Sequence, residues 1–323
     1  MPVTRDDLHL NQYLTNLSIA YMQDADQFVA GKVFPSVRTN KQTNKYTILS
    51  RADWNRSEMK PRAPTTEAVY AQWGRSSDFY DCEEFALGTL VSDQDKANAD
   101  DPIRPTEDAA RYLAHQVLLH RERKWADAYF KAGVWGVEVT GGTEVSRFSD
   151  PAGDPIKDIK KLMRDQLKAT GFKPNKLILG QKSADELLEH PDIIERVLYA
   201  PVDGLARAEL PELARLFGLD SVMVVGAIQN TAAEGAAEAS DFILDEEDAL
   251  LVYAPANAGD KIATAGTVFE WTGVTPELQS TGIFEIREPK KRADHYEVND
   301  NCDMKVTGAD LGVYMINVGE DTP

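Results

Sequence analysis

The stretch PNKLILGQKSADELLEHPDIIERV, residues 174–197, contains the residue types of a phosphate-binding loop. A short apolar run reaches Gly180, Lys182 and a serine follow, and the apolar spacing then predicts a helix. A P-loop has the spacing G-x-x-x-x-G-K-[ST], because its glycine-rich backbone wraps the phosphates that the lysine contacts. Here Asn175 stands where the first glycine would be, and Gln181 separates Gly180 from the lysine. The stretch therefore does not predict a nucleotide site.

Helix capping explains the same stretch better. Ser183 and Glu186 have the S-x-x-E spacing of a capping box, in which each side chain bonds the other residue's backbone amide. Pro191 suits the first position of a second helix, and Asp192 suits its positively polarised first turn. We therefore predict a strand end, a turn and a capped helix, followed by a second helix that begins at a proline.

The histidines have no spacing typical of a metal or catalytic site. His115 and His120 are five residues apart on a predicted helix, so they do not share the face that an i, i+4 zinc pair occupies. His190 precedes a proline at a predicted helix junction, where capping or packing explains it. The sequence also lacks H-E-x-x-H, G-x-S-x-G and G-x-G-x-x-G. We therefore predict no catalytic residues, no metal and no cofactor.

Acidic and thiol groups also give no functional motif. Asp245–Asp248 is a run of carboxylates that could hold a hard cation, but it lacks the alternating spacing of a calcium loop. We interpret it as a solvated turn between strands. Cys82 and Cys302 are far apart in sequence and form neither a metal motif nor a disulfide framework, so we predict two buried free thiols.

Length and composition indicate a folded protein with one large domain or two ordinary ones. The chain has 323 residues, of which 42% are hydrophobic and 27% charged. Its net charge of -18 repels nucleic acid, so we do not expect a general nucleic-acid binder. No apolar run approaches the ~18 residues of a membrane span, and the first residues lack the basic start and apolar core of a signal peptide. We expect an intracellular or intracellularly assembled protein without a membrane partner.

Residues 35–75 differ from the rest of the chain in charge. They hold eight basic and three acidic residues, a net +5, which leaves -23 for the remainder. Residues 44–50 and 68–73 are rich in β-branched and aromatic side chains and predict two strands. A basic hairpin on an acidic protein suits an acidic partner surface, although a solvated loop explains the charges equally well from the sequence alone.

The remaining sequence alternates helices and strands. Residues 106–132 predict a long helix capped by Thr106 and ended by Gly133, and about 26 residues at ~1.5 Å each would extend about 39 Å. Helix and strand patterns alternate over 156–271, which indicates an α/β unit, and 282–318 predicts two or three further strands. Within the α/β unit we expect helices at 156–171 and 208–219 and strands at 221–230, 241–255 and 266–271.

The order of these elements resembles the major capsid proteins of tailed bacteriophages, which have the HK97-type fold. An arm leads into a long basic hairpin, a very long helix follows, then an α/β unit, and the chain returns to strands. The most specific local likeness is in residues 174–197, whose P-N-strand-helix-L-x-x-H-P pattern resembles a segment of many phage capsid subunits. The resemblance covers nearly the whole chain.

This resemblance implies an α+β protein with an HK97-like capsid fold. The fold comprises an N-arm, an extended β-hairpin called the E-loop, a peripheral domain with a long spine helix, and an α/β axial domain. The implied boundaries are 1–34 for the N-arm, 35–80 for the E-loop, 81–165 for the peripheral domain with its spine helix at 106–132, 166–280 for the axial domain, and 281–323 for the return to the peripheral domain.

The resemblance also implies what the protein assembles with. Copies would form pentamers and hexamers of an icosahedral virion capsid, which encloses double-stranded DNA without reading its sequence and without enzymatic activity. Assembly would take place in the host cytoplasm, with a separate scaffolding protein, a portal protein and a decoration protein as further partners. The E-loop would lie across a neighbouring subunit, and its candidate contacts are Arg51, Trp54, Arg56, Lys60 and Arg62, with Trp54 as an apolar anchor at the tip of the loop.

Two other classes remain open from the sequence. An encapsulin-like compartment shell shares this fold and encloses cargo proteins, although the arm and the long hairpin favour the phage subunit. A small-molecule α/β enzyme built on residues 174–197 would have to act without recognisable catalytic residues.

Overall fold

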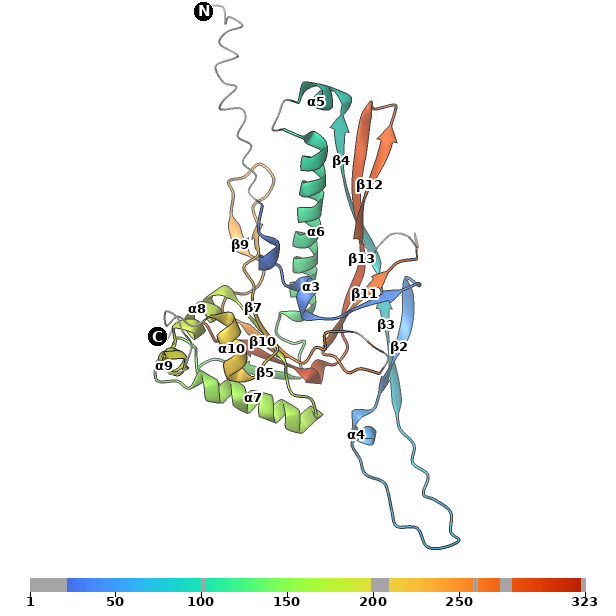
Figure 1. Cartoon of the computed structure of the whole chain (residues 1–323), viewed down its shortest axis with the longest axis vertical. Helices are drawn as coiled ribbons and strands as arrows, with labels where there is room; N and C mark the ends of the chain where they lie inside the picture. The colour runs from blue at the N-terminus through green and yellow to red at the C-terminus, as the bar shows by residue number, and fades with distance from the viewer. Residues whose placement is uncertain are drawn as a thin grey trace, which may run out of the picture.

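Two packed regions and a projecting hairpin make up the described part of the chain, which is residues 22–99, 103–198, 209–257, 259, 261–273 and 281–320 of a computed structural model. Figure 1 shows a long helix beside long strands, a group of shorter helices and strands at the base of that helix, and a hairpin whose loop extends away from the body.

Secondary structure covers most of the described residues. The helical segments are η1 (Ala25–Gln27), α3 (Ala30–Val33), α4 (Arg51–Trp54), α5 (Asp93–Asn98), α6 (Pro105–Tyr129), α7 (Pro155–Thr170), α8 (Gln181–Glu189), α9 (Pro191–Leu198), α10 (Leu210–Phe217) and η2 (Ala309–Leu311). The strands are β1 (Ser36–Thr39), β2 (Thr43–Leu49), β3 (Arg75–Asp81), β4 (Glu83–Ser92), β5 (Val137–Thr140), β6 (Lys176–Leu179), β7 (Ser221–Val224), β8 (Ile228–Asn230), β9 (Ser240–Phe242), β10 (Ala249–Val252), β11 (Gly266–Trp271), β12 (Thr281–Glu288), β13 (Ala293–Val306) and β14 (Gly312–Ile316).

Helix α6 packs along the first of two five-stranded sheets, the one with the longer strands. The sheet has the order β1-β11-β13-β12, and β4 pairs with the other edge of β13. Leu113 of α6 is fully buried in a cluster with Val91, Tyr296 and Val298 from these strands. The long helix predicted for 106–132 is confirmed, with ends that differ by one to three residues.

The predicted cap of this helix is wrong. Arg104 is the N-cap and Pro105 the first helical residue, so Thr106 already lies inside the helix. Proline suits that place because an amide at the first helical position has no acceptor within the helix, so no hydrogen bond is lost when the amide hydrogen is absent. The helix ends at Tyr129, and Gly133 follows in a turn with a φ of +85°, a conformation that favours glycine.

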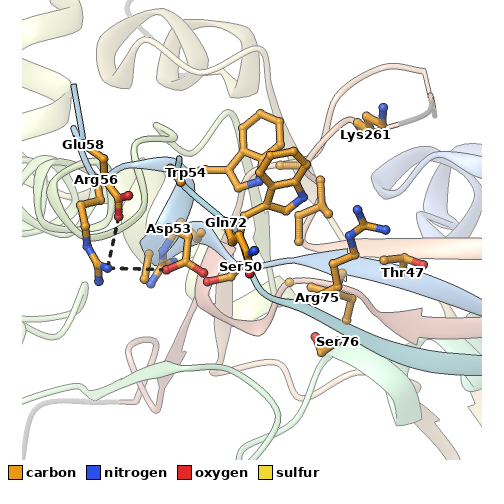
Figure 2. A pocket seen from close by; sticks show the side chains of 18 of the residues that line it. Thr47, Ser50, Asp53, Trp54, Arg56, Glu58, Gln72, Arg75, Ser76 and Lys261 are labelled. Atoms are coloured by element: carbon orange, nitrogen blue, oxygen red, sulfur yellow. Dashed lines mark ion pairs between the residues drawn. The ribbon is translucent and has the colours of Figure 1, made fainter. Parts of the chain in front are cut away.

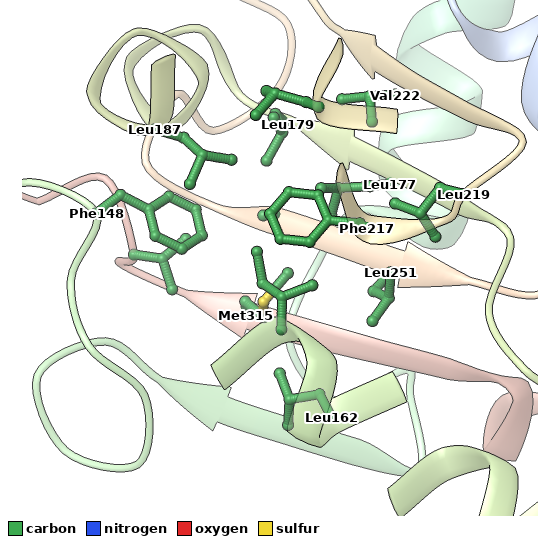
Figure 3. Close-up of a cluster of buried hydrophobic side chains, with 14 of the residues drawn as sticks. Phe148, Leu162, Leu177, Leu179, Leu187, Phe217, Leu219, Val222, Leu251 and Met315 are labelled. Carbon is green, nitrogen blue, oxygen red and sulfur yellow. The ribbon is translucent and has the colours of Figure 1, made fainter. Parts of the chain in front are cut away.

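The second sheet is covered on both faces. Its order is β5-β14-β10-β6-β7, with parallel and antiparallel pairs. Because side chains alternate along a strand, Leu177 and Leu179 face one core cluster while Ile178 faces the other. Figure 3 shows the first cluster, where Leu162 of α7, Leu187 of α8 and Phe217 of α10 converge on the strands. The second cluster contains Trp125 and Tyr129 of α6, which joins the two sheets.

The N-terminal segment is attached to this core from residue 23 onward. The carboxylate of the fully buried Glu122 accepts hydrogen bonds from the amides of Val29 (3.0 Å) and Ala30 (2.9 Å). Lys176 donates to the carbonyl of Lys32 (3.0 Å). The N-arm predicted for 1–34 falls partly outside the described residues, because nothing before residue 22 is described.

The strand, turn and two helices predicted for 174–197 are confirmed as β6, α8 and α9, but the capping box is wrong. Helix α8 begins at Gln181 with Gly180 as its N-cap, so Ser183 is a buried residue inside the helix. The amide of Ser183 donates to the carbonyl of Glu246 (2.9 Å). A Cβ on Gly180 would lie 2.4 Å from the carbonyl oxygen of Asp245. Close packing against the 245–247 turn therefore sets the start of the helix.

The hairpin has one predicted strand and one that was misplaced. Strand β2 confirms the prediction for 44–50, but its partner is β3 at 75–81, and residues 68–73 form no strand. Strand β3 has no apolar alternation, because only Tyr80 of its residues is buried. The apolar side chains at 68–73 are instead exposed in the loop between the strands.

The other predicted elements are present with adjusted ends. Helices at 156–171 and 208–219 appear as α7 and α10, and the strand at 266–271 is β11. The pattern at 282–318 forms the three strands β12, β13 and β14. Two predicted strands are each divided, since 221–230 contains β7 and β8, and 241–255 contains β9 and β10.

Candidate subunit interface

The loop between β2 and β3, residues 50–74 and hereafter the hairpin loop, is closed at its neck by hydrogen bonds. The amide of Ser50 donates to the carbonyl of Gly74 (3.0 Å), and the amide of Gly74 donates to the Asp53 carboxylate (2.9 Å). This hydrogen bond is the main cause that lowers the pKa of Asp53. Beyond the neck the loop leaves the body, as Figure 1 shows. The neck therefore holds an otherwise extended loop at a defined place.

The four basic candidates do not form one patch of unpaired cations. Arg51 forms an ion pair with Asp310 on the body. Arg56 lies 4.0 Å from the Asp53 carboxylate and 3.7 Å from that of Glu58, the pairs drawn as dashed lines in Figure 2. In addition, Arg62 donates to the carbonyl of Thr66, and among the described residues Lys60 forms no ion pair. Such exposed pairs contribute only ~0–1 kcal/mol each, so a partner's carboxylates could replace them.

The fifth candidate, Trp54, was predicted at the tip of the loop, but it lies in α4 beside the neck. There it belongs to an exposed aromatic pair that the sequence did not reveal. Its side chain is 61% exposed and meets Trp73 edge to face, with ring centroids 6.2 Å apart. The Arg75 guanidinium lies 5.9 Å from the Trp73 ring centroid. Met59, Val69 and Tyr70 on the same loop are also exposed. Several large apolar side chains exposed on one loop are typical of an interaction site.

A hollow of about 1520 Å³ separates the hairpin loop from the body. Figure 2 shows Trp54, Gln72, Arg75 and Lys261 among the residues around it. Phe172 and Ile262 line its body side. The described residues therefore leave an open space on the body-facing side of the loop.

The predictions for the two cysteines and for His190 are confirmed. Cys82 and Cys302 are free and fully buried. Burial raises the pKa of the Cys82 thiol to about 11 and that of Cys302 to about 12, so neither is a ready nucleophile. His190 ends α8, and its Nδ1 accepts from the amide of Asp192 (3.2 Å), which confirms a capping role.

The acidic run was interpreted correctly in part. Asp245 and Glu246 are exposed in a turn between β9 and β10, as predicted. Asp248 is buried instead, and accepts from the Tyr314 hydroxyl (2.5 Å) and the Asn317 amide (2.7 Å). Within the described part of the chain, no group of three or more His, Cys, Asp or Glu residues could hold a metal ion. No described helix combines the length and apolar character needed to cross a membrane.

Known proteins with similar sequences are phage capsid proteins. No protein-family model matches the chain. The major capsid protein of Pseudomonas phage JBD67 is 24% identical over 309 residues, which is 94% of this chain and 95% of that protein. The major capsid protein of Burkholderia phage BcepMu is also 24% identical, over 67% of this chain and 68% of that protein. The chain is a relative of phage major capsid proteins.

Solved structures show that the chain has the HK97-type capsid fold. A phage-related protein from Bordetella bronchiseptica has a TM-score of 0.67 at 19% identity, over 93% of this chain and 95% of that one. The capsid of cyanophage P-SCSP1u has a TM-score of 0.62 at 10% identity, over 98% and 95% of the two chains. The SrpI encapsulin of Synechococcus elongatus has a TM-score of 0.59 at 9% identity, over 99% of each chain. The resemblance inferred from the order of elements is confirmed.

Proposed function

We propose that the chain is the major capsid protein of a tailed double-stranded DNA bacteriophage. Its copies assemble into the pentamers and hexamers of an icosahedral shell that encloses the genome. The observation that carries this proposal is the hairpin loop, which extends from the body of a capsid-fold chain and exposes the pair Trp54 and Trp73. An exposed pair of tryptophans is a poor surface for a monomer and a good anchor for an interface.

Charge supports another copy as the partner of this loop. Residues 35–75 carry +5, whereas the remaining residues carry -23. The neighbour's body is therefore acidic, and its carboxylates can pair with Lys60 and exchange with the weak partners of Arg51, Arg56 and Arg62. A closed shell repeats each such contact many times, so small pair energies add up.

The domain division follows the capsid fold in this proposal. We assign residues 1–34 to the N-arm, 35–80 to the E-loop, 81–165 and 281–323 to the peripheral domain, and 166–280 to the axial domain. Assembly would take place in the host cytoplasm with a separate scaffolding protein, a portal protein and a decoration protein. The acidic chain would surround the DNA without reading its sequence.

A compartment shell is the second candidate. The SrpI encapsulin aligns with 99% of this chain, which favours a closed shell without deciding its content. The sequence relatives named as phage capsid proteins favour the phage function. Analysis of purified particles decides between the two, since a phage shell holds DNA and a compartment holds cargo protein.

Charge reversal of the hairpin loop tests the proposal. We expect the variant with Arg51, Arg56, Lys60 and Arg62 all changed to Glu to fold with an unchanged circular dichroism spectrum and to form few closed particles. A second variant that keeps Arg51, and with it the pair to Asp310, should behave alike.

The matched control reverses four exposed lysines of α7, namely Lys157, Lys160, Lys161 and Lys168. Negative-stain microscopy and sedimentation measure the particle yield. Equal yields from the hairpin and control variants would contradict a role of the hairpin charges in assembly.

A further inference from the structure

The hollow between the hairpin loop and the body has cations in its lining that no described carboxylate neutralises. Lys60 and Arg75 line it from the side of the hairpin, and Lys261 lines it from the body. None of these three side chains forms an ion pair with a described residue. Trp54 and Trp73 add aromatic surface to the same lining. The hollow therefore suits an acidic segment that is narrow enough to enter between the loop and the body.

The β8–β9 hairpin is an acidic segment of that shape. The nine residues between its strands, TAAEGAAEA (231–239), include five alanines and a glycine, and nearly all of them are exposed. The carboxylates of Glu234, Glu238 and Asp241 are exposed and pair with no described cation. Residues 216–260 contain nine acidic residues and no Lys or Arg, so no cation nearby in sequence offsets these charges. The hairpin therefore presents unpaired carboxylates on a narrow support.

This hairpin lies away from the hollow of its own chain. The Gln23 side chain donates to the carbonyl of Ile228 (2.7 Å) and accepts from its amide (2.8 Å), which holds β8 in place. The next two residues, Gln229 and Asn230, line a different hollow beside α6. Figure 1 shows β9 beside α6, whereas the hairpin loop extends from the other end of the molecule. A contact between the two surfaces therefore requires a second copy of the chain.

We infer that the β8–β9 hairpin of one copy enters the hollow beside the hairpin loop of the next copy. Three carboxylates then meet three unpaired cations, namely Glu234, Glu238 and Asp241 with Lys60, Arg75 and Lys261. The two surfaces are different parts of one chain, so the contact is heterologous, and heterologous contacts close copies into rings when the rotation between copies allows it. Such rings are the pentamers and hexamers of the proposed function, on which this inference rests.

Charge reversal with rescue tests the pairing. The variant with Glu234→Lys, Glu238→Lys and Asp241→Lys should keep its circular dichroism spectrum, and its yield of closed particles should fall by about tenfold or more. Adding Lys60→Glu, Arg75→Glu and Lys261→Glu to the same chain should restore most of that yield, because the pairs then form with the charges exchanged.

The matched control reverses three exposed carboxylates outside the hairpin, namely Asp127, Asp165 and Glu189, and should assemble like the parent chain. If the parent forms particles and the hairpin variant forms as many, the inference fails while the proposed function stands. A loss that the second set of reversals does not rescue would also overturn the inference. If the parent itself forms no particles, the proposed function fails.

Cross-linking in assembled particles locates the hairpin directly. Ala236 is exposed between the strands of the hairpin, and Met59 is 96% exposed and lines the hollow. A short bis-maleimide should join A236C of one copy to M59C of the next, and it should spare the buried Cys82 and Cys302. A236C with K157C on α7 is the control and should give no covalent multimers. Equal multimer yields from the two pairs would overturn the inference, as would no multimers with M59C when mass spectrometry shows both engineered cysteines modified.

Discussion

The buried carboxylate of Glu122 shows how one residue can be decisive without a signal in the sequence. It lies in the run RERK, residues 121–124, which suggests a solvated helix face. In the structure it is fully buried and accepts hydrogen bonds from Val29 and Ala30, nearly a hundred residues away. No local pattern contains that partner, so only the fold reveals the role. Asp248, read as part of a solvated turn, is missed for the same reason.

The pH dependence of stability tests the environment of Glu122. Burial raises the pKa of its carboxyl, because desolvation outweighs the hydrogen bonds from Ala30 and Val29. A raised folded pKa means that its contribution to stability is present below the unfolded pKa of about 4.3 and lost as the pH rises through the folded value. Glu122→Gln cannot titrate, so the unfolding temperature of the parent should fall relative to this variant as the pH rises above about 4.

Thermal unfolding of both proteins across this pH range measures the difference. Glu189→Gln serves as the control, since Glu189 is exposed at the end of α8. A difference that stays constant with pH, or grows in favour of the parent, would contradict a raised pKa at Glu122.

Among the elements, α6 is the best predicted and β3 the worst. A proline at the first position of α6 and the recurring apolar residues along it give a local pattern, and tertiary packing agrees with that pattern. Strand β3 is exposed on nearly all sides, so its sequence RSSDFYD shows no alternation. Residues 75–81 form a strand because they pair with β2, and the sequence of β3 alone gives no sign of that pairing. The start of α8 likewise depends on contact with the 245–247 turn.

Packing of α6 on the long sheet should depend on Leu113. Leu113→Ala removes a fully buried side chain from a small cluster with Val91, Tyr296 and Val298. We expect the free energy of unfolding to fall by about 2–5 kcal/mol. Leu167→Ala is the matched control, because Leu167 is 43% exposed on another helix, and its loss should be below about 1 kcal/mol. Denaturant titration measures both, and equal losses would show that α6 does not pack as described.

For the whole molecule, the order of elements predicted more than any motif did. The long helix, the basic hairpin and the returning strands identified the capsid fold, while the apparent phosphate loop was only a strand and a turn. Of the exposed pair, Trp54 was predicted as an anchor, whereas Trp73 was assigned to a strand that does not form. These two side chains are far apart in sequence. They meet because the hydrogen bond between Gly74 and Asp53 closes the neck of the hairpin loop beside them.

Assembly should depend on the tryptophan pair more than stability does. Trp54→Ala removes an exposed side chain, so we expect an unchanged unfolding temperature. If Trp54 anchors the interface, the protein concentration needed for assembly should rise by about tenfold or more. Tyr112→Ala, which removes an exposed aromatic ring of α6, is the control. Sedimentation at a series of concentrations measures both, and an equal effect of the two substitutions would exclude a special role for Trp54.

The central claim is that the hairpin loop joins copies of this chain into a closed shell. An electron cryomicroscopy map of the particles formed by the purified chain tests it most directly. The map should show closed shells in which residues 50–74 of each copy lie across the body of its neighbour. Monomers or small oligomers under all assembly conditions, or shells in which each loop folds back on its own chain, would contradict the claim.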